Sequence, residues 1–351
     1  MSRPTVLEIL ADRLDDLGPM QRRTALAVLD DPGGILQGTV SGVDVSALRL
    51  LAVDLDLSGA GELRVELSRL LESRVASLGG ALPRSPAAPV DVEEFTIDLS
   101  SGGVPCTLLG AATDGPLILF SVGFGASRRD GMPPGRAGND LSPTLVTGLL
   151  DAGYRVLLVE NPEQGERLSL ASDPVEAVRA GLVRRPNILD LTQSETPALL
   201  DHLVRRNVVD DPGRVATVGH SWGALNAMLR LAGDVRIACC VAVIPVVDPS
   251  DLVSLEDLVD TLRGFSLADR LAIGRRARPL LLVSGALDGV APESSVRHLL
   301  DVSASGAGGI SWSSLPDVAH RLDPREVELM VEFLRTHLPV DGRPAGRSRR
   351  E

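Results

Sequence analysis

Beginning at residue 92, short apolar runs alternate with segments of helical periodicity, and no other pattern in the chain limits its possible folds so strongly. Continuous apolar runs bounded by helices are typical of parallel strands in a sheet that is covered on both faces. Only a Ser-Gly-Gly turn separates the first two runs, which predicts an antiparallel hairpin leading into that sheet. The pattern therefore predicts an α/β fold with a mostly parallel, eight-stranded sheet. The runs are VEEFTIDL, VPCTLLGA, PLILFSV, RVLLVE, RVATVG, RIACCVAVI, PLLLVSG and ISWSSL, with helices expected near 140–152, 187–206, 222–232, 291–302 and 324–337.

The rest of the chain differs in composition from this main domain, which we assign to residues 92–340. Residues 1–78 show helical spacing only and predict a small all-helical amino-terminal cap domain. Residues 79–91 are rich in proline and alanine and predict a linker between the two domains. The final residues, 341–351, are expected to form a disordered tail.

Charge and composition exclude several classes of function. The chain has 35 basic and 47 acidic residues, a net charge of −12, which disfavours nucleic acid as a partner. Every basic residue is arginine, so a lysine Schiff base and a lysine-containing P-loop are both excluded. No apolar stretch approaches the roughly 18 residues of a transmembrane helix, and the acidic first residues do not resemble a signal peptide. We therefore expect a cytoplasmic protein without a membrane partner.

The chain contains three cysteines, Cys106, Cys239 and Cys240. An odd number with one adjacent pair forms no disulfide framework, and no Cys/His spacing predicts a zinc site. Cys239 and Cys240 lie within the apolar run IACCVAVI, where successive side chains of a strand point to opposite faces. We expect buried, unreactive thiols, no metal and no cofactor.

The segment Gly219-His220-Ser221-Trp222-Gly223 has the GxSxG spacing. The motif by itself is weak evidence, but an apolar strand leads into it and a helical pattern follows it. In a strand–turn–helix of this kind the serine adopts a strained conformation and its hydroxyl projects above the sheet. We therefore predict Ser221 as a nucleophile, with the backbone amide of Trp222 facing a developing oxyanion.

A serine nucleophile needs a base held by a third group. Of the five histidines, only His320 lies in a loop beyond the last strand, from which it can reach Ser221, and we predict it as the base. His202, His298 and His337 lie in helical segments. His220 is inside the turn and is expected to have a packing role.

The predicted acid is Asp288, in a loop directly after an apolar strand, with Asp248 as its rival after the preceding strand. Asp317 is close to His320 in sequence and is more simply interpreted as a turn residue. The second oxyanion donor is expected from the glycine-containing loop SVGFGAS, at the amide of Phe124.

Together these residues resemble the α/β-hydrolase superfamily over about residues 92–338. The segments GHSWG, GALDGVAP, PDVAHRL and VGFGAS follow the family's order, Ser…Asp…His, and the resemblance implies an eight-stranded α/β-hydrolase sheet. One difference is Val122-Gly123, where many relatives have His-Gly. Residues 248–276 follow the sixth strand, where the family places lids, and predict a helical lid insertion. The amino-terminal helices resemble those of fermentation-respiration-switch-type and dihydropseudooxynicotine-hydrolase-type relatives.

The expected function is that of a serine hydrolase that cleaves a small ester, thioester or amide through an acyl-enzyme on Ser221. The same groups could serve an acyltransferase, a cyclase or a carbon–carbon bond hydrolase. An inactive homologue that binds a ligand or partner is an alternative of another class. The expected partner is a small acyl substrate, and a homodimer is possible. The sequence does not indicate which acyl group is bound.

Overall fold

The computed structural model of this chain describes most of the predicted main domain and no residue before Val90. The predicted cap domain 1–78, most of the linker 79–91 and the tail 341–351 lie outside the described residues, so these assignments stay predictions. The described residues are 90–111, 114–133, 142–169, 171, 173–184, 188–252, 255, 258–262, 265–274, 278–303, 309–318, 320 and 323–340.

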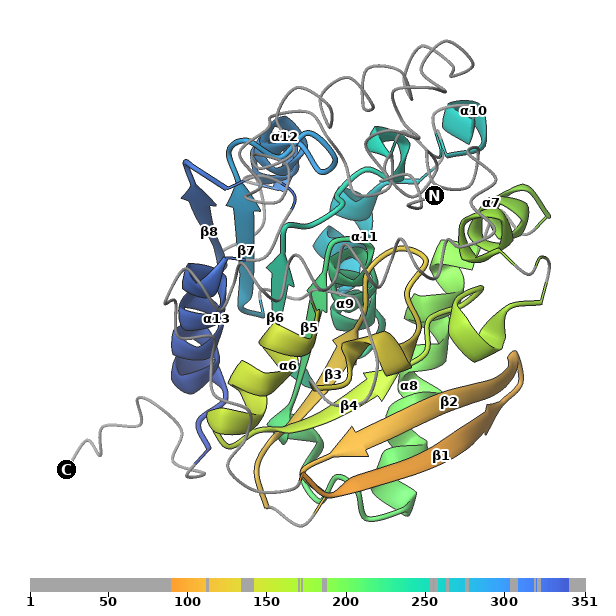
Figure 1. Cartoon of the computed structure of the whole chain (residues 1–351), viewed down its shortest axis with the longest axis vertical. Helices are drawn as coiled ribbons and strands as arrows, with labels where there is room; N and C mark the ends of the chain where they lie inside the picture. Colours follow the sequence, from red (N-terminus) through yellow and green to blue (C-terminus); the bar gives the residue numbers. More distant parts are fainter. Residues whose placement is uncertain are drawn as a thin grey trace, which may run out of the picture. The chain divides into compact units, whose positions relative to one another are not determined.

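One eight-stranded sheet organises this part of the chain, in the order β1-β2-β4-β3-β5-β6-β7-β8 (Figure 1). The pairs β1–β2 and β2–β4 are antiparallel, and every other neighbouring pair is parallel. The predicted fold class, including the initial hairpin, is therefore confirmed. The strands are β1 Val92–Leu99, β2 Gly102–Leu109, β3 Leu117–Ser121, β4 Arg155–Val159, β5 Val215–His220, β6 Ile237–Val243, β7 Leu280–Gly285 and β8 Ile310–Leu315.

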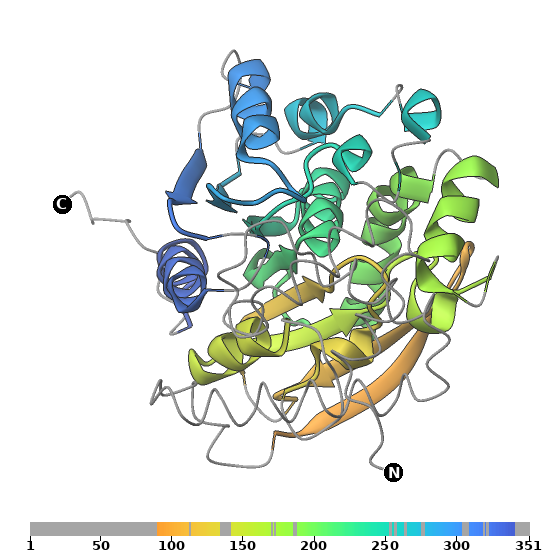
Figure 2. The same ribbon diagram turned by 45° about the horizontal axis from the view of Figure 1, so that its top comes forward.

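Helices cover both faces of the sheet, as Figures 1 and 2 show. One face packs against α7, α8, α9, α11 and α12, and the other against α6 and α13. Strands β3, β5 and β7 are buried at every position, which explains their unbroken apolar sequences. The helices are α6 Ser142–Asp151, α7 Pro174–Arg184, α8 Ile188–Arg205, α9 Trp222–Gly233, α10 Val259–Leu262, α11 Leu267–Gly274, α12 Glu293–Ser303 and α13 Pro324–His337.

The two layers separate the adjacent cysteines as predicted. Cys239 belongs to the core beneath α6 and α13, and Cys240 to the core beneath α9 and α11. All three cysteines are buried and free. Burial raises the pKa of Cys106 and Cys240 to about 12 and also raises that of Cys239, so none is poised to ionise near neutral pH.

One helix, α7, differs from the sequence expectations, whereas the segment after β6 agrees with them. Helix α7 was not predicted, because its short apolar stripe is interrupted by Gly181, where the helix packs closely on Ile188 and Glu163. The segment after β6 forms short helices as predicted: the 3-10 turn η5 Pro249–Asp251, then α10 and α11. Helix α11 packs tightly on α9, since a Cβ at Gly274 would lie 2.1 Å from the carbonyl oxygen of Ala232. A lid role for this segment stays a prediction.

The amino ends of the parallel strands carry a row of arginines that donate to backbone carbonyls; we call this end of the sheet the amino edge. Arg155 Nε donates to Gly115 O (2.9 Å), and Arg214 donates to Val340 O (3.0 Å). Arg236 Nη2 donates to Pro197 O (3.0 Å), and Arg278 Nη1 to Ile237 O (2.9 Å). Each arginine begins, or lies just before, a strand, so the row joins neighbouring strands and helices at this edge.

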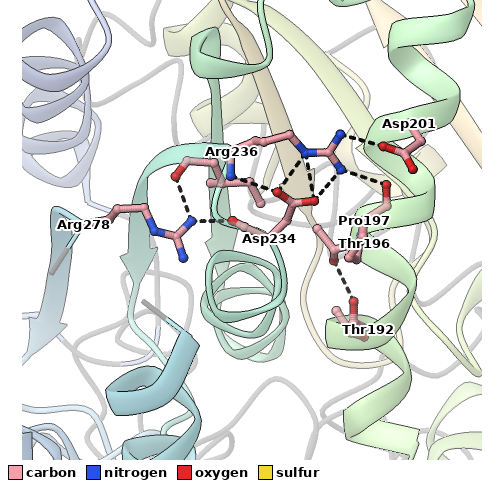
Figure 3. Close-up of polar contacts among 8 residues, drawn as sticks. Thr192, Thr196, Pro197, Asp201, Asp234, Arg236 and Arg278 are labelled. Atoms are coloured by element: carbon pink, nitrogen blue, oxygen red, sulfur yellow. Dashed lines mark hydrogen bonds and ion pairs between the residues drawn. The ribbon is translucent and has the colours of Figure 1, made fainter. Parts of the chain in front are cut away.

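Figure 3 shows the densest part of this row, around the start of β6. Arg236 bridges the carboxylates of Asp234 and Asp201, with Nη1 2.6 Å from Asp201 Oδ1. It also donates to the carbonyl of Pro197 on α8, the residue after Thr196, whose hydroxyl donates to Thr192 O. Arg278 donates on the other side to the carbonyls of Leu231, Asp234, Ile237 and Gly274.

None of the described helices combines the length and the apolar composition that crossing a bilayer requires.

Candidate active site

Ser221 lies in a strained turn between β5 and α9. Its backbone has φ 57° and ψ −119°, a conformation that is costly for a residue other than glycine. The flanking glycines make this turn possible. A Cβ at Gly219 would lie 2.0 Å from Gly223 O, and a Cβ at Gly223 would lie 2.0 Å from Ser121 O. The GxSxG spacing is thus required by the close passage of β5, α9 and the end of β3.

Hydrogen bonds to the neighbouring strand hold this strained residue in place. Ser221 N donates to Val243 O (2.9 Å), and Ser221 O accepts from Val246 N (3.3 Å). The same carbonyl accepts from Ala224 N (2.9 Å), which starts the helix. The serine backbone is therefore fixed by β6 as well as by its own turn.

Three side chains meet at the carboxyl ends of the parallel strands, which we call the carboxyl edge. Ser221 Oγ lies 3.0 Å from His320 Nε2, and His320 Nδ1 lies 2.8 Å from Asp288 Oδ2. Ser221 follows β5, Asp288 follows β7 and His320 follows β8. The structure therefore brings together the three residues that the sequence singled out.

The Asp288 carboxylate is oriented by its own loop. Its Oδ1 accepts from Val290 N and Ala291 N, both at 2.8 Å, which leaves Oδ2 for the histidine. The Asp288 side chain is fully buried, whereas that of His320 is 22% exposed. With Asp288 ionised, Nδ1 of His320 carries the proton and Nε2 faces Ser221 as an acceptor.

The other acids and histidines lie elsewhere. Asp248 is exposed and caps η5 by accepting from Ser250 N (2.8 Å). Asp317 is exposed and pairs with Arg325 (2.8 Å).

His220 is buried with its ring centroid 6.2 Å from that of His320. Burial, and secondarily His320, lowers the pKa of His220 to about 3, so its imidazole is neutral. His202, His298 and His337 lie on α8, α12 and α13, as predicted.

The two residues expected to supply the oxyanion donors are in contact through their side chains. The rings of Phe124 and Trp222 make an edge-to-face contact with centroids 5.2 Å apart. Trp222 is the first residue of α9, where backbone N–H groups have no partner within the helix. Across the part of the chain that the structure describes, neither the Phe124 nor the Trp222 backbone N–H is paired with an acceptor.

A third loop, after β4, reaches this region and was not singled out by the sequence. Gln164 Nε2 donates to Gly123 O (2.8 Å), and Asn161 Nδ2 donates to Gln164 Oε1 (2.9 Å). Both side chains are completely buried. Their position just after an apolar parallel strand was the available signal, since ligands of open α/β sheets bind at the carboxyl ends of strands.

Glu160 ties the same two loops together. Its buried Oε1 accepts from Arg128 N (2.9 Å), in the 3-10 turn η2 Arg128–Gly131 that ends the loop after β3. Its Oε2 accepts from Glu166 N (3.5 Å), in the turn η3 Gly165–Arg167. Burial raises the pKa of Glu160 to about 7 despite these backbone donors. Gly165 has φ +51°, and a Cβ there would lie 2.3–2.5 Å from the Glu160 carboxylate.

Within the described ranges, no group of three His, Cys, Asp or Glu side chains is arranged to hold a metal ion.

Comparison with known proteins identifies the family of the chain. Residues 118–344, well over half of the chain, match the alpha/beta hydrolase family. The chain therefore belongs to the alpha/beta hydrolase family, which confirms the resemblance found in the sequence. No curated protein sequence matches it.

Solved structures with a similar fold are distant in sequence. TT1662 from Thermus thermophilus is 20% identical, with a TM-score of 0.54 over 72% of this chain and 99% of that one. The acylaminoacyl peptidase of Pyrococcus horikoshii is 12% identical, with a TM-score of 0.54 over 74% of this chain and 43% of that one. A cold-adapted esterase from an Arctic intertidal metagenomic library is 18% identical, with a TM-score of 0.50 over 71% and 94%. At these identities the likeness concerns the fold.

Proposed function

We propose that this protein is a serine hydrolase that cleaves a small ester, thioester or amide through an acyl-enzyme on Ser221. The observation that carries the proposal is the continuous hydrogen-bonded row from Ser221 Oγ through His320 to Asp288, with distances of 3.0 and 2.8 Å. Family membership supports the same reaction class. The esterase and peptidase among the structural neighbours are consistent with acyl chemistry.

The proposed reaction begins with proton transfer from Ser221 Oγ to His320 Nε2 as the oxygen attacks the substrate carbonyl. Asp288 holds the imidazole in the required tautomer and stabilises the imidazolium. The carbonyl oxygen becomes an oxyanion, which accepts hydrogen bonds from the Phe124 and Trp222 amides.

His320 then donates its proton to the leaving group, and the acyl-enzyme forms. A water molecule gives a proton to His320 as it attacks the acyl carbon; His320 then returns this proton to Ser221 Oγ as the Oγ–acyl bond breaks and the acid product leaves. No step requires a cofactor.

The test is intact-mass analysis of the whole chain after incubation with a fluorophosphonate, beside a panel of p-nitrophenyl esters of rising chain length. In the labelling reaction Ser221 Oγ bonds to phosphorus, fluoride leaves and His320 takes the proton. We expect one adduct per chain, none in Ser221→Ala, and turnover of short esters. Folded wild-type protein that neither takes up the probe nor cleaves any ester would overturn the proposal.

A further inference from the structure

The structure assigns a positioning role to Gln164, held by Asn161: it sets the direction of the Phe124 amide in the oxyanion hole. This inference rests on the function proposed above, because that amide matters only if an oxyanion forms on Ser221. It concerns a residue that does not touch Ser221, His320 or Asp288.

The Gly123 carbonyl and the Phe124 N–H belong to one peptide unit. A trans peptide is planar, so its C=O and N–H point in opposite directions and rotate together. The Gly123 carbonyl therefore fixes the Phe124 N–H. Gln164 Nε2 donates to this carbonyl at 2.8 Å, and Ala126 N donates to it at 3.3 Å. Glycine at position 123 leaves the backbone free to turn about this peptide, so the orientation has to come from such partners.

The Gln164 amide itself has only one satisfactory orientation. Gly123 O is an acceptor, so the group that faces it is the donor Nε2. Oε1 then faces Asn161 Nδ2 at 2.9 Å, the donor it needs. Reversing the amide would place acceptor against acceptor at Gly123 and donor against donor at Asn161.

Burial makes this arrangement stiff. Gln164 and Asn161 are both 0% exposed, so water cannot replace a lost hydrogen bond without entering the core. The other end of the same loop is held by Glu160, which accepts from Arg128 N. The loop after β4 thus holds the loop after β3 at two points, on either side of Phe124.

A preorganised donor contributes to the transition state and little to binding of the ground state. Loss of a whole oxyanion donor costs roughly 10²–10³-fold in kcat, so loss of its orientation is expected to cost about 10–100-fold. KM for the same ester is expected to change less than about threefold.

The experiment compares wild type with Gln164→Glu, Gln164→Leu and Asn161→Asp, on the best ester from the panel. Gln164→Glu keeps the shape and the acceptor for Asn161; its carboxyl group can donate to Gly123 O only while it is protonated, so this variant is assayed up to pH 9, where the ionised form cannot donate. Gln164→Leu removes both bonds. Asn161→Asp removes the donor that fixes the amide. The matched control is Gln193→Leu on α8, which removes a part-buried glutamine whose Oε1 accepts from Arg270.

The readout that separates positioning from general damage is a trifluoromethyl ketone carrying the same acyl chain. Ser221 adds to its carbonyl, the proton passes to His320, and the resulting alkoxide occupies the oxyanion hole. We expect its Ki to rise in each variant by the same factor by which kcat/KM falls. Thermal unfolding identifies variants that fail to fold. Asn161→Asp and Gln164→Glu differ least in shape from wild type, so their kcat/KM and Ki still test the role of Gln164 if Gln164→Leu does not fold.

The role of Gln164 would be overturned by folded variants that keep the wild-type kcat/KM and Ki. It would also be overturned if kcat/KM fell no further in these variants than in Gln193→Leu. A fall in kcat/KM with unchanged Ki would also overturn it. Failure of the proposed function looks different, because wild type itself would then show neither labelling by the fluorophosphonate nor ester turnover.

Discussion

The two ends of the sheet are built from the same strands but are held in different ways. At the amino edge, Arg155, Arg214, Arg236 and Arg278 bind backbone carbonyls. At the carboxyl edge, Ser221 is held at φ 57°. The side-chain amide of Gln164 and the carboxylates of Glu160 and Asp288 there orient loop peptides and the His320 ring.

The difference follows from the direction of the strands. Parallel strands deliver all their carboxyl ends to one edge, where loops lead outward and can present several side chains to one point. The amino edge has a structural role. A guanidinium group has five donors, so one arginine there can donate to the carbonyls of several strands and helices. We therefore expect substitutions at the carboxyl edge to change rates, and those at the amino edge to change the free energy of unfolding.

The largest expected effect is that of Ser221→Ala. Without the nucleophile, kcat for an ester should fall by roughly 10⁴–10⁶-fold. The melting temperature should change by only a few degrees, because the hydroxyl makes a single part-buried hydrogen bond. Steady-state kinetics and thermal unfolding measure the two effects. Substantial turnover by the purified variant would remove Ser221 from the mechanism.

Asp288→Asn should have the next largest effect. An asparagine can still accept from Val290 N and Ala291 N, but its amide group would then face His320 Nδ1–H, donor against donor. The imidazole would adopt the other tautomer, and kcat should fall about 10³–10⁴-fold.

The controls for Asp288→Asn are the other two acids, Asp248→Asn and Asp317→Asn. Both are exposed, and both should retain wild-type kcat. An activity loss in Asp248→Asn as large as that in Asp288→Asn would reverse the assignment of the acid.

At the amino edge, Arg236→Ala should lower the free energy of unfolding by about 2–3 kcal/mol. It leaves Asp234, whose side chain is 6% exposed, without the guanidinium that pairs with it. Denaturant unfolding measures the loss, and kcat of the folded variant should equal that of wild type.

Arg206→Ala provides the comparison for Arg236→Ala, because the Arg206–Glu93 pair is exposed on both sides and should contribute less than about 1 kcal/mol. Equal stability losses in the two variants, or a fall in kcat for Arg236→Ala, would contradict the division between the two edges.

The smallest expected effect depends on pH and concerns Glu326, at the start of α13. Burial raises the pKa of Glu326 from 4.5 to about 8, despite a hydrogen bond from Asp323 N. Between these values the unfolded chain carries the charge while the folded chain keeps the proton, so stability falls as pH rises across this window. Glu326→Gln removes the titration, and its stability relative to wild type should increase from pH 5 to pH 9.

Thermal unfolding at both pH values checks this prediction by a difference of a few degrees. Glu332→Gln, on an exposed position of the same helix, should show no such dependence on pH. A difference that is constant with pH, or that shrinks as pH rises, would contradict a raised pKa at Glu326.

Much of the fold was predictable because its signals are local. The apolar runs marked all eight strands, and the Ser-Gly-Gly turn marked the antiparallel hairpin. Helix α7 was missed because its apolar stripe is short and Gly181 interrupts it. Glycine there serves a close contact with Ile188, which no local pattern reveals.

For the candidate site, the sequence singled out Ser221, Asp288 and His320, and the structure places them within hydrogen-bonding distance. The sequence did not single out Gln164, because its hydrogen bond to Gly123 joins residues that are 41 positions apart. Glutamine in a polar loop after a strand looks like any solvated residue until burial is known.

The sequence alone determined where the strands, the hairpin turn and most of the helices form, because side-chain periodicity, glycine and proline act within a few residues. It also determined which groups can be nucleophile, base and acid, since few residue types have that chemistry and their loops follow strands. Only the tertiary structure decided which carbonyl each arginine binds and which peptide Gln164 orients. Such pairings depend on the strand order, in which β4 lies beside β3 and not beside β5.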